Sequence, residues 1–323
     1  MSKLTVSVII CTYTEERLTD IREAIYSVRQ QTYSPDEVLL VVDNNEHLYA
    51  ELAAEFGGDL RVLISNKNTG VSAARNVGIR AAKGEIIAFL DDDTVAQPQW
   101  LERLIEHYQD ETIIGVMGET LLTWANGKPP VWFPWEFDWI LGGTAHKQLL
   151  TNGQEVYTIS DPNMSFRREV LVSAGLWREG LGQQVRSGRN ARGGDIAEIC
   201  HRIRQAYPQG RFIYEPSAVV FHKLPAPRAR LSYFLHCAFL EGETRASVDR
   251  VTRIRSMGRQ MFPTHQAYLR NVLAKRLPAR LSRFYRPVCI LQLLVMLLIL
   301  ALMAGGYIRE RVTQGKHLKR CQS

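Results

Sequence analysis

Over its first hundred residues the chain alternates short apolar runs with segments in which apolar residues recur every three or four positions. The runs are rich in Val, Ile and Leu, which is typical of strands buried on both faces of a sheet. They cover residues 6–11, 37–42, 61–64 and 86–90.

Between these runs the apolar spacing predicts helices. Leu18, Ile21, Ile25 and Val28 mark the first helix, which Pro35 follows. The others are expected at 48–56, at 73–82 with Ser72 as the N-cap, and at 98–108. Strands and helices that alternate in this way predict an α/β fold with a doubly wound, mostly parallel sheet.

After residue 114 the pattern becomes irregular. Residues 124–141 hold four of the six tryptophans and three prolines, and we expect loops and short antiparallel strands that could wall a cleft. Small polar residues at 187–194 predict a mobile loop. Residues 195–205 show helical spacing, and 211–221 read as a further strand.

Positive charge is concentrated between residues 223 and 286, which hold 14 Lys and Arg against 3 Asp and Glu in a chain of net charge +7. Such a segment suits an anionic partner, either phospholipid or nucleic acid. The uncharged apolar stretch 287–308 favours lipid, because about 20 apolar residues can cross a bilayer as a helix. A buried C-terminal helix or an interfacial hairpin is the alternative. Basic residues flank both ends, so the positive-inside rule does not decide the orientation.

The length of 323 residues accommodates one large α/β domain with appendages, or two small domains. No signal peptide precedes the first apolar run, so we expect the main domain in the cytoplasm. The cysteines are scattered without CxxC spacing, which argues against a disulfide framework or a zinc site. They are Cys11, Cys200, Cys237, Cys289 and Cys321.

Three adjacent carboxylates, Asp91, Asp92 and Asp93, end the run at 86–90. This places them at the edge of the sheet where open α/β folds bind ligands. Like charges so close repel one another unless a cation or hydrogen-bond donors compensate them. Mg²⁺ or Mn²⁺ held by carboxylates and substrate phosphates is the simplest compensator, and a solvated acidic turn is the alternative.

Other polar residues follow neighbouring strands or begin a helix near the same edge. Thr12, Tyr13 and Asp43 end parallel strands, where a hydroxyl, a carbonyl or a carboxylate can contact a nucleobase or ribose. Arg75 can reach a phosphate or base with its fork of donors, and Lys67 is a further candidate. Strand-end packing for Thr12 and Tyr13, and a surface salt bridge for Arg75, are the alternatives.

Four motifs therefore occur in order on successive strand ends: VIICTY at 8–13, VVDN at 41–44, NxGxxxARNxG at 68–78 and AFLDDD at 88–93. Together they resemble the nucleotide-sugar-binding half of family 2 glycosyltransferases with the GT-A fold, and the resemblance extends over about residues 5–222.

The resemblance implies a role for each strand end. It assigns uracil recognition to Asp43, with Thr12 and Tyr13 lining the base. It makes the triplet a DxD motif that binds a divalent metal, in which Asp93 is the direct ligand. Asp91 and Asp92 would face the ribose and the metal's waters, with Asp91 as a second candidate ligand.

An inverting transfer also needs a base that deprotonates the acceptor hydroxyl. Family members commonly have Glu-Asp where this chain has Gly194-Asp195, and the resemblance assigns the base role to Asp195. The expected position at a helix N-terminus favours the ionised carboxylate, although an N-cap would stand at the same place. Glu198, one turn further on, is the reserve candidate.

The resemblance further implies that Asp161 and Asn163 bond sugar hydroxyls and that His222 completes the metal site. A turn before a strand would equally explain the first two, and a structural donor would explain His222. A processive synthase would carry Gln-x-x-Arg-Trp after the base, which this chain lacks, so we expect one sugar per encounter.

These observations predict an inverting, metal-dependent glycosyltransferase that uses a nucleotide-diphosphate sugar, expected to be a UDP-sugar, and a lipid-linked or cell-envelope glycan acceptor. A non-catalytic, membrane-tethered nucleotide-binding partner of another transferase is the alternative, favoured by Gly194. A dinucleotide-dependent oxidoreductase is disfavoured because no GxGxxG follows the first strand. A nucleic-acid binder is disfavoured because the basic segment adjoins the apolar stretch.

We expect a catalytic domain at 1–222, with a nucleotide-binding half at 1–110 and an acceptor half at 111–222. A basic membrane-proximal segment (223–286), a transmembrane helix (287–308) and a short basic tail (309–323) follow. This organisation predicts a single C-terminal helix in the cytoplasmic (inner) membrane and a catalytic domain on its cytoplasmic side.

Overall fold

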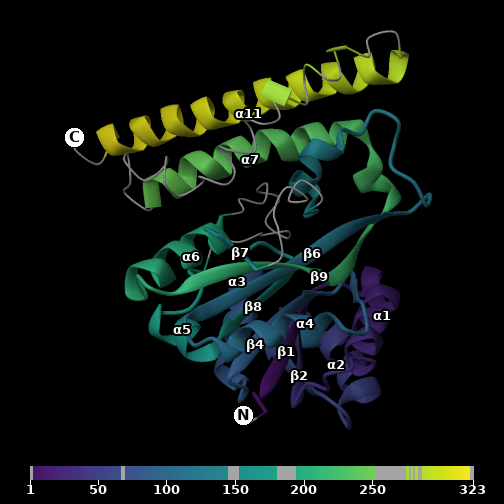
Figure 1. Cartoon of the computed structure of the whole chain (residues 1–323), viewed down its shortest axis with the longest axis vertical. Helices are drawn as coiled ribbons and strands as arrows, with labels where there is room; N and C mark the ends of the chain where they lie inside the picture. The colour runs from purple at the N-terminus through teal and green to yellow at the C-terminus, as the bar shows by residue number, and fades with distance from the viewer. Residues whose placement is uncertain are drawn as a thin grey trace.

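The computed structural model describes residues 3–66, 70–144, 153–179, 194–251 and 286–320, together with 274, 275, 278, 281 and 282. Over these residues a nine-stranded sheet forms the centre of the molecule (Figure 1). Lys67, most of the loop expected at 187–194 and much of the basic segment lie outside the described residues.

The first half of the sheet is parallel, as the alternating pattern predicts. β1 pairs in parallel with both β2 and β4, and β2 pairs in parallel with β3. The residues that follow β1, β2 and β4 therefore meet at one edge of the sheet. The elements of this half are β1 (Val6–Thr12), α1 (Leu18–Arg29), β2 (Glu37–Asp43), α2 (Glu46–Phe56), β3 (Arg61–Ser65), α3 (Val71–Ala81) and β4 (Ile86–Asp91).

The second half adds antiparallel strands, so the whole sheet is mixed. β8 runs antiparallel to β4 and β6, and β9 is parallel to β6 but antiparallel to β5 and β7. The elements of this half are β5 (Thr94–Ala96), α4 (Trp100–Glu106), β6 (Ile113–Trp124), β7 (Gln154–Val156), β8 (Asn163–Arg167), α5 (Arg168–Ser173), α6 (Asp195–Ala206) and β9 (Arg211–Leu224).

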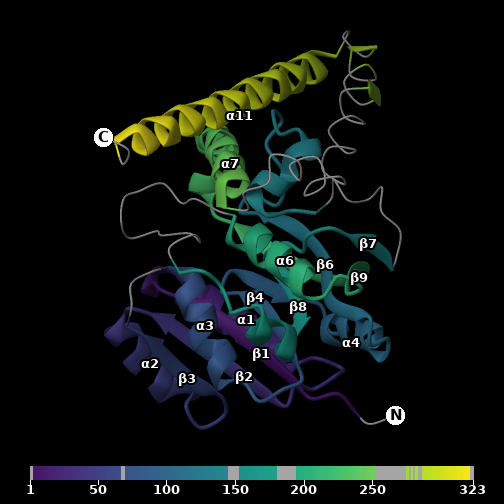
Figure 2. The same ribbon diagram turned by 90° about the vertical axis from the view of Figure 1, so that its left-hand side faces the viewer.

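Helices cover both faces of the sheet (Figure 2). Helices α1, α2 and α4 pack with Ile10 on one face, and α3, α5 and α6 pack with Ile9 on the other. Because neighbouring residues of one strand enter different cores, the strand has to be apolar on both sides. This packing explains the continuous apolar runs in the sequence.

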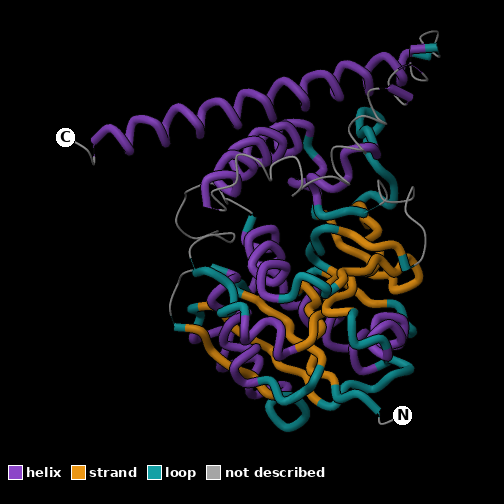
Figure 3. The backbone as a smooth tube through the Cα atoms, turned by 60° about the vertical axis from the view of Figure 1, so that its left-hand side comes forward, coloured by secondary structure: helices purple, strands orange, loops and turns teal. Residues whose placement is uncertain are grey.

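A third apolar cluster joins the tryptophan-rich segment to two C-terminal helices, α7 (Leu231–Val251) and α11 (Pro287–Arg320). It contains Phe137 from the segment, Phe234 from α7 and Met296 from α11. Figure 3 shows α11 along the outer edge of the molecule, with α7 between it and the strands. We call this set of contacts the third apolar cluster.

Two glycines bring the backbones of α7 and α11 into contact. A Cβ on Gly242 would lie 2.0 Å from the carbonyl oxygen of Met303, and a Cβ on Gly306 would lie 2.1 Å from that of Phe239. Both distances are far below van der Waals contact. The helix pair therefore needs glycine at both positions.

Two local predictions are wrong. The tryptophan-rich segment forms loops over residues 125–134, as expected, but a 3-10 helix, η3 (Trp135–Leu141), in place of short strands. Its three prolines lack the N–H groups that a sheet ladder requires. Ser72 lies inside α3, whose N-cap is Gly70, so Ser72 is not the cap.

Candidate active site

A cavity of about 380 Å³ lies at the edge of the sheet where β1, β2 and β4 end. It receives the residues that follow the three strands, together with side chains from α3, α6, β9 and α7. Its polar lining includes Thr12, Tyr13, Arg17, Asp43, Arg75, Asp91, Asp92, Asp93, Asp161, Asp195, His222, Arg228 and Tyr233. The fold thus brings most of the residues predicted from the sequence into one space.

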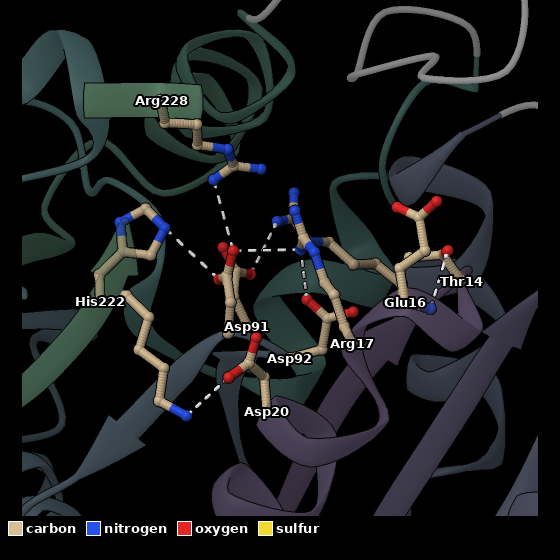
Figure 4. A network of polar contacts seen from close by, with 11 residues as sticks. Thr14, Glu16, Arg17, Asp20, Asp91, Asp92, His222 and Arg228 are labelled. Carbon is tan, nitrogen blue, oxygen red and sulfur yellow. Dashed lines mark hydrogen bonds and ion pairs between the residues drawn. The ribbon is translucent and has the colours of Figure 1, made fainter. Parts of the chain in front are cut away.

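Cationic side chains compensate the aspartate triplet. Arg17 Nη1 lies 2.7 Å from Asp92 Oδ1 and 3.1 Å from Asp93 Oδ2. Arg228 Nη1 lies 3.4 Å from Asp93 Oδ2, and His222 Nε2 lies 3.4 Å from Asp93 Oδ1. Figure 4 shows Arg17, His222 and Arg228 pointing toward the aspartates from different parts of the chain. Asp92 and Asp93 are buried, so the triplet is not a solvated turn.

The three carboxyls differ in acidity because different groups face them. Burial raises the pKa of Asp91 well above its usual range, and repulsion from Asp161 adds to this effect. Burial also raises the pKa of Asp92, although Arg17 opposes the rise. For Asp93 the effect of burial is outweighed by His222 and the two arginines, which hold its pKa below the ordinary value. Asp93 is therefore the most firmly ionised of the three.

Arg75 is a buried hub and not a surface salt bridge. Its side chain is 4% exposed and lies 2.8 Å from Asp161, 3.2 Å from Asp195 and 3.9 Å from Asp91. Its guanidinium also lies over the ring of Trp177. One cation therefore connects carboxylates from β4, from the loop before β8 and from α6.

Asp195 is the first residue of α6, and its carboxylate faces the cavity. Asp195 Oδ2 accepts hydrogen bonds from Ser72 Oγ at 3.1 Å and Arg75 Nη1 at 3.2 Å. The N-cap is Gly194, and no side chain forms a capping bond there. The carboxylate is thus oriented by α3 across the cavity and does not act as a helix cap.

The glycine before Asp195 has a local structural cause. Gly194 has φ of +109°, a left-handed conformation that favours glycine. A Cβ at this position would also lie 2.5 Å from Val248 Cγ2 of α7. Packing of α7 against the start of α6 therefore excludes a larger residue.

The fit of a divalent cation rests on Asp93 and His222, which present oxygen and nitrogen donors to the same point. The guanidinium groups of Arg17 and Arg228 show that this point attracts positive charge. In addition, Asp161 Oδ1 is buried without a hydrogen-bond partner among the described residues. No group of three or more His, Cys, Asp or Glu side chains in the described part of the chain forms a complete metal site.

The structure places two predicted site residues elsewhere. Asn163 is fully buried in the sheet, where it accepts from Trp100 Nε1 at 2.8 Å and donates to the carbonyls of Glu119 and Ala218. It does not line the cavity, so the structure does not bring it together with the other predicted site residues.

Glu198, predicted as the reserve base, likewise lies outside the cavity lining. Its carboxylate is bound by Arg202 at 2.7 and 2.8 Å and by Arg178 at 3.0 Å. Glu198 is 2% exposed and is held by these arginines away from the cavity, so Asp195 remains the favoured candidate for the base.

Sequence reasoning missed several lining residues, among them Arg17, Arg228, Tyr233 and Cys237. Arg17 follows the first strand, and its position in the sequence soon after Thr12 and Tyr13 could have indicated that it lines the same site. No sequence signal marks the other three, because they lie in the basic segment and on α7, which reach the cavity only through tertiary packing.

Comparisons with known proteins identify the family of the chain. The model of the family "Glycosyl transferase family 2" matches residues 7–173. The glucosyl-dolichyl phosphate glucuronosyltransferase of Haloferax volcanii is 31% identical over 246 residues, which cover 76% of this chain and 77% of the relative. Glycosyltransferase AglE of the same organism is 37% identical over 127 residues, covering 38% of this chain and 41% of the relative.

Two solved structures share the fold. The mannosyltransferase PcManGT of Pyrobaculum calidifontis, with GDP-Man and Mn²⁺, gives a TM-score of 0.60 at 18% identity and covers 95% of this chain and 88% of its own. GalNAc-T7 with UDP, GalNAc and Mn²⁺ gives 0.53 at 19% identity, covering 81% of this chain. The chain spans 54% of the GalNAc-T7 chain.

The shared fold and the family match together define a glycosyltransferase of the GT-A type. The family match covers half of the chain, and the match to the glucosyl-dolichyl phosphate glucuronosyltransferase covers three quarters of it. The chain belongs to glycosyl transferase family 2.

Proposed function

We propose that the protein is an inverting glycosyltransferase that moves one sugar from a nucleotide-diphosphate sugar to a lipid-linked acceptor at a membrane surface. The observation that carries this proposal is the single cavity in which the aspartate triplet and Asp195 both lie. One end of such a site can receive the leaving diphosphate, and the other can activate the acceptor.

On the donor side, Asp43 with Thr12 and Tyr13 would bind the base and ribose. Their place at the strand ends is the usual location for a nucleotide in an open α/β sheet. Arg17 and Arg228 form ion pairs with the aspartate triplet, so their guanidinium groups lie close enough to bind a phosphate in place of a carboxylate. With uracil recognition assigned to Asp43, a UDP-sugar is the favoured donor.

Asp93 and His222, with Asp91, would hold a divalent cation. Bound there, Mn²⁺ or Mg²⁺ supplies Lewis-acid stabilisation of the leaving diphosphate. Both solved structures that share the fold contain Mn²⁺, which supports the choice of ion.

On the acceptor side, Asp195 would act as the base. Ser72 and Arg75 fix its Oδ2 and leave the carboxylate facing the cavity. It takes the proton of the acceptor hydroxyl while that oxygen bonds to the anomeric carbon. The bond from that carbon to the phosphate oxygen breaks, and its electron pair leaves with the diphosphate.

The lipid-linked acceptor is supported by two observations. The relative that is 31% identical over 246 residues is named as a glucosyl-dolichyl phosphate glucuronosyltransferase. Its name indicates that this member of the family acts on a lipid-linked sugar. In the described part of this chain one helix, Pro287–Thr313, is long and apolar enough to cross a membrane, with a mean hydropathy of 2.8. We place the catalytic domain on the cytoplasmic face, where nucleotide sugars are made.

A panel of UDP- and GDP-sugars tests the proposal, with donor hydrolysis and transfer measured in Mn²⁺ and in chelator. Asp93→Ala should abolish turnover and weaken donor binding in Mn²⁺. Asp195→Asn should retain donor binding by calorimetry and lower transfer by roughly 10² to 10⁴. Asp59→Asn, on an exposed aspartate paired with Arg29, is the matched control and should have no effect.

The result that would contradict the proposal is equally defined. Nucleotide binding without turnover of any donor would establish the non-catalytic partner instead. Turnover that is equal in Mn²⁺ and in chelator would refute the metal dependence alone.

A further inference from the structure

The outward face of α11 is apolar along most of its length. Between residues 287 and 308 its exposed large apolar side chains are Val288, Ile290, Leu291, Leu294, Leu297, Leu298 and Ile308. The sequence from 287 to 308 contains no charged residue, and at about 1.5 Å per residue this stripe is about 30 Å long. No other part of the chain that the structure describes covers it, and a continuous apolar stripe of this size is typical of an interaction surface.

The inward face of α11 contacts the rest of the protein over the same length. Near its start, Gln292 Nε2 donates to the carbonyl of Val131 at 2.8 Å. Its middle part, from Val295 to Met303, packs in the third apolar cluster. Near the end of the apolar stripe, Tyr307 Oη donates a hydrogen bond to Asp249 at 2.8 Å.

These contacts are incompatible with a helix that crosses a bilayer. A crossing helix would carry the irregular chain at 131–133 into the hydrocarbon, where unpaired backbone groups are costly. It would also carry in Asp249 of α7, whose carboxylate accepts the hydrogen bond from Tyr307 within the stripe. A helix that lies flat in the interface keeps both on the aqueous side.

Charge at the two ends of the stripe indicates what kind of surface it meets. Exposed Arg286 precedes the stripe, and exposed Arg309 and Arg311 follow it. Residues 223–286 add an excess of positive charge in the adjoining sequence. An apolar stripe between basic ends fits the acyl and phosphate layers of an anionic lipid surface.

The geometry points to α11 as an in-plane membrane-docking helix, which lies flat on an anionic bilayer and does not cross it. The same helix supports a wall of the cavity, because Leu141 and Leu224 both line the cavity and belong to the third apolar cluster. Docking through α11 therefore holds the cavity beside the lipid surface. That a lipid-linked acceptor is presented there rests on the proposed function; the docking itself does not.

Flotation of the full chain with vesicles tests the docking. The protein should float with phosphatidylcholine vesicles that contain phosphatidylglycerol, and less with phosphatidylcholine alone. Leu294→Glu places a charge on the most exposed leucine of the stripe, at 58%, and should weaken binding about tenfold or more. Val172→Glu is the matched control, since Val172 is 49% exposed on α5, and it should float like the parent protein.

A tag on the C-terminus distinguishes flat docking from crossing. When protein is added to preformed vesicles, external protease should remove the tag, because the whole of α11 stays outside. Protection of the tag would overturn the inference. So would flotation that Leu294→Glu leaves unchanged while its circular dichroism shows a folded protein.

A second copy of the chain is the other occupant that the stripe could take. A dimer in the absence of vesicles that Leu294→Glu converts to a monomer, with no flotation of the parent protein, would overturn the inference in favour of that copy. Donor hydrolysis measured on the same samples reports on the proposed function separately, because the soluble donor needs no vesicle.

Discussion

Removal of the Arg75 charge is the most direct test of how the cavity is held together. Arg75→Met keeps the aliphatic stem and deletes the cation that connects Asp161, Asp195 and Asp91. Breaking a buried ion pair costs about 3–5 kcal/mol, because a charge is left without its partner. Here the side chains of Asp161 and Asp91 are about one third exposed to the cavity and can hydrate, so the lower end applies, about 3 kcal/mol.

Urea unfolding followed by tryptophan fluorescence measures this loss. With a urea m-value of about 3 kcal/mol/M, the midpoint of Arg75→Met should fall by about 1 M. Arg22→Met is the matched control, since Arg22 lies 2.8 Å from Glu55 but is 38% exposed. An exposed ion pair contributes little to stability because solvent screens it, so the midpoint of the control should stay close to that of the parent protein.

A double variant separates charge from packing. Asp161→Asn removes the carboxylate nearest to Arg75, so it should be much less harmful in Arg75→Met than in the parent protein. The coupling energy should reach about 1 kcal/mol or more. Strictly additive losses, or a urea midpoint of Arg75→Met that equals that of Arg22→Met, would refute the view that buried Arg75 compensates the carboxylates around it.

Three further variants test single contacts. Asn163→Ala should lower the free energy of unfolding by about 3 kcal/mol, since it leaves Trp100 Nε1 and two carbonyls unpaired, with donor hydrolysis per folded protein unchanged. Glu198→Gln should keep transfer activity where Asp195→Asn loses it, and equal losses would show that Glu198 reaches the acceptor. Glu215 has a pKa held below its ordinary value, because hydrogen bonds outweigh burial. The ionised carboxylate therefore stabilises the fold at pH values above its ordinary pKa. Glu215→Gln should lower the free energy of unfolding by about 1.5–3 kcal/mol at neutral pH, measured by thermal melts. The difference in stability between variant and parent should disappear as the pH falls through the lowered pKa.

The sequence predicts the first half of the fold well because the information there is local. The strands β1, β2 and β4 are buried on both faces, so each has to be a continuous apolar run, and the polar residues after them mark one edge of the sheet. β8 carries no such signal. Its five residues pair with β4 and β6 through contacts that no local pattern records.

Side-chain roles in the site are less predictable where they depend on partners far along the chain. Ser72 has the sequence context of an N-cap, yet its hydroxyl bonds Asp195. Asn163 is a polar residue near Asp161, yet the central position of β8 encloses it completely. Both assignments required knowledge of which elements become neighbours, and this is decided by packing of the whole domain.

The contacts of Arg17, Arg75 and Arg228 have a consequence for the order in which the molecule forms. Arg17 binds Asp92 across 75 positions, Arg75 binds Asp195 across 120, and Arg228 binds Asp93 across 135. Contacts of such long sequence separation carry a high loop-closure cost and form late in folding. During synthesis the N-terminal strands can fold first, but the cavity remains incomplete until α7 has left the ribosome. A partly made chain that ends before α7 therefore lacks Tyr233 and Cys237, which complete the lining of the cavity.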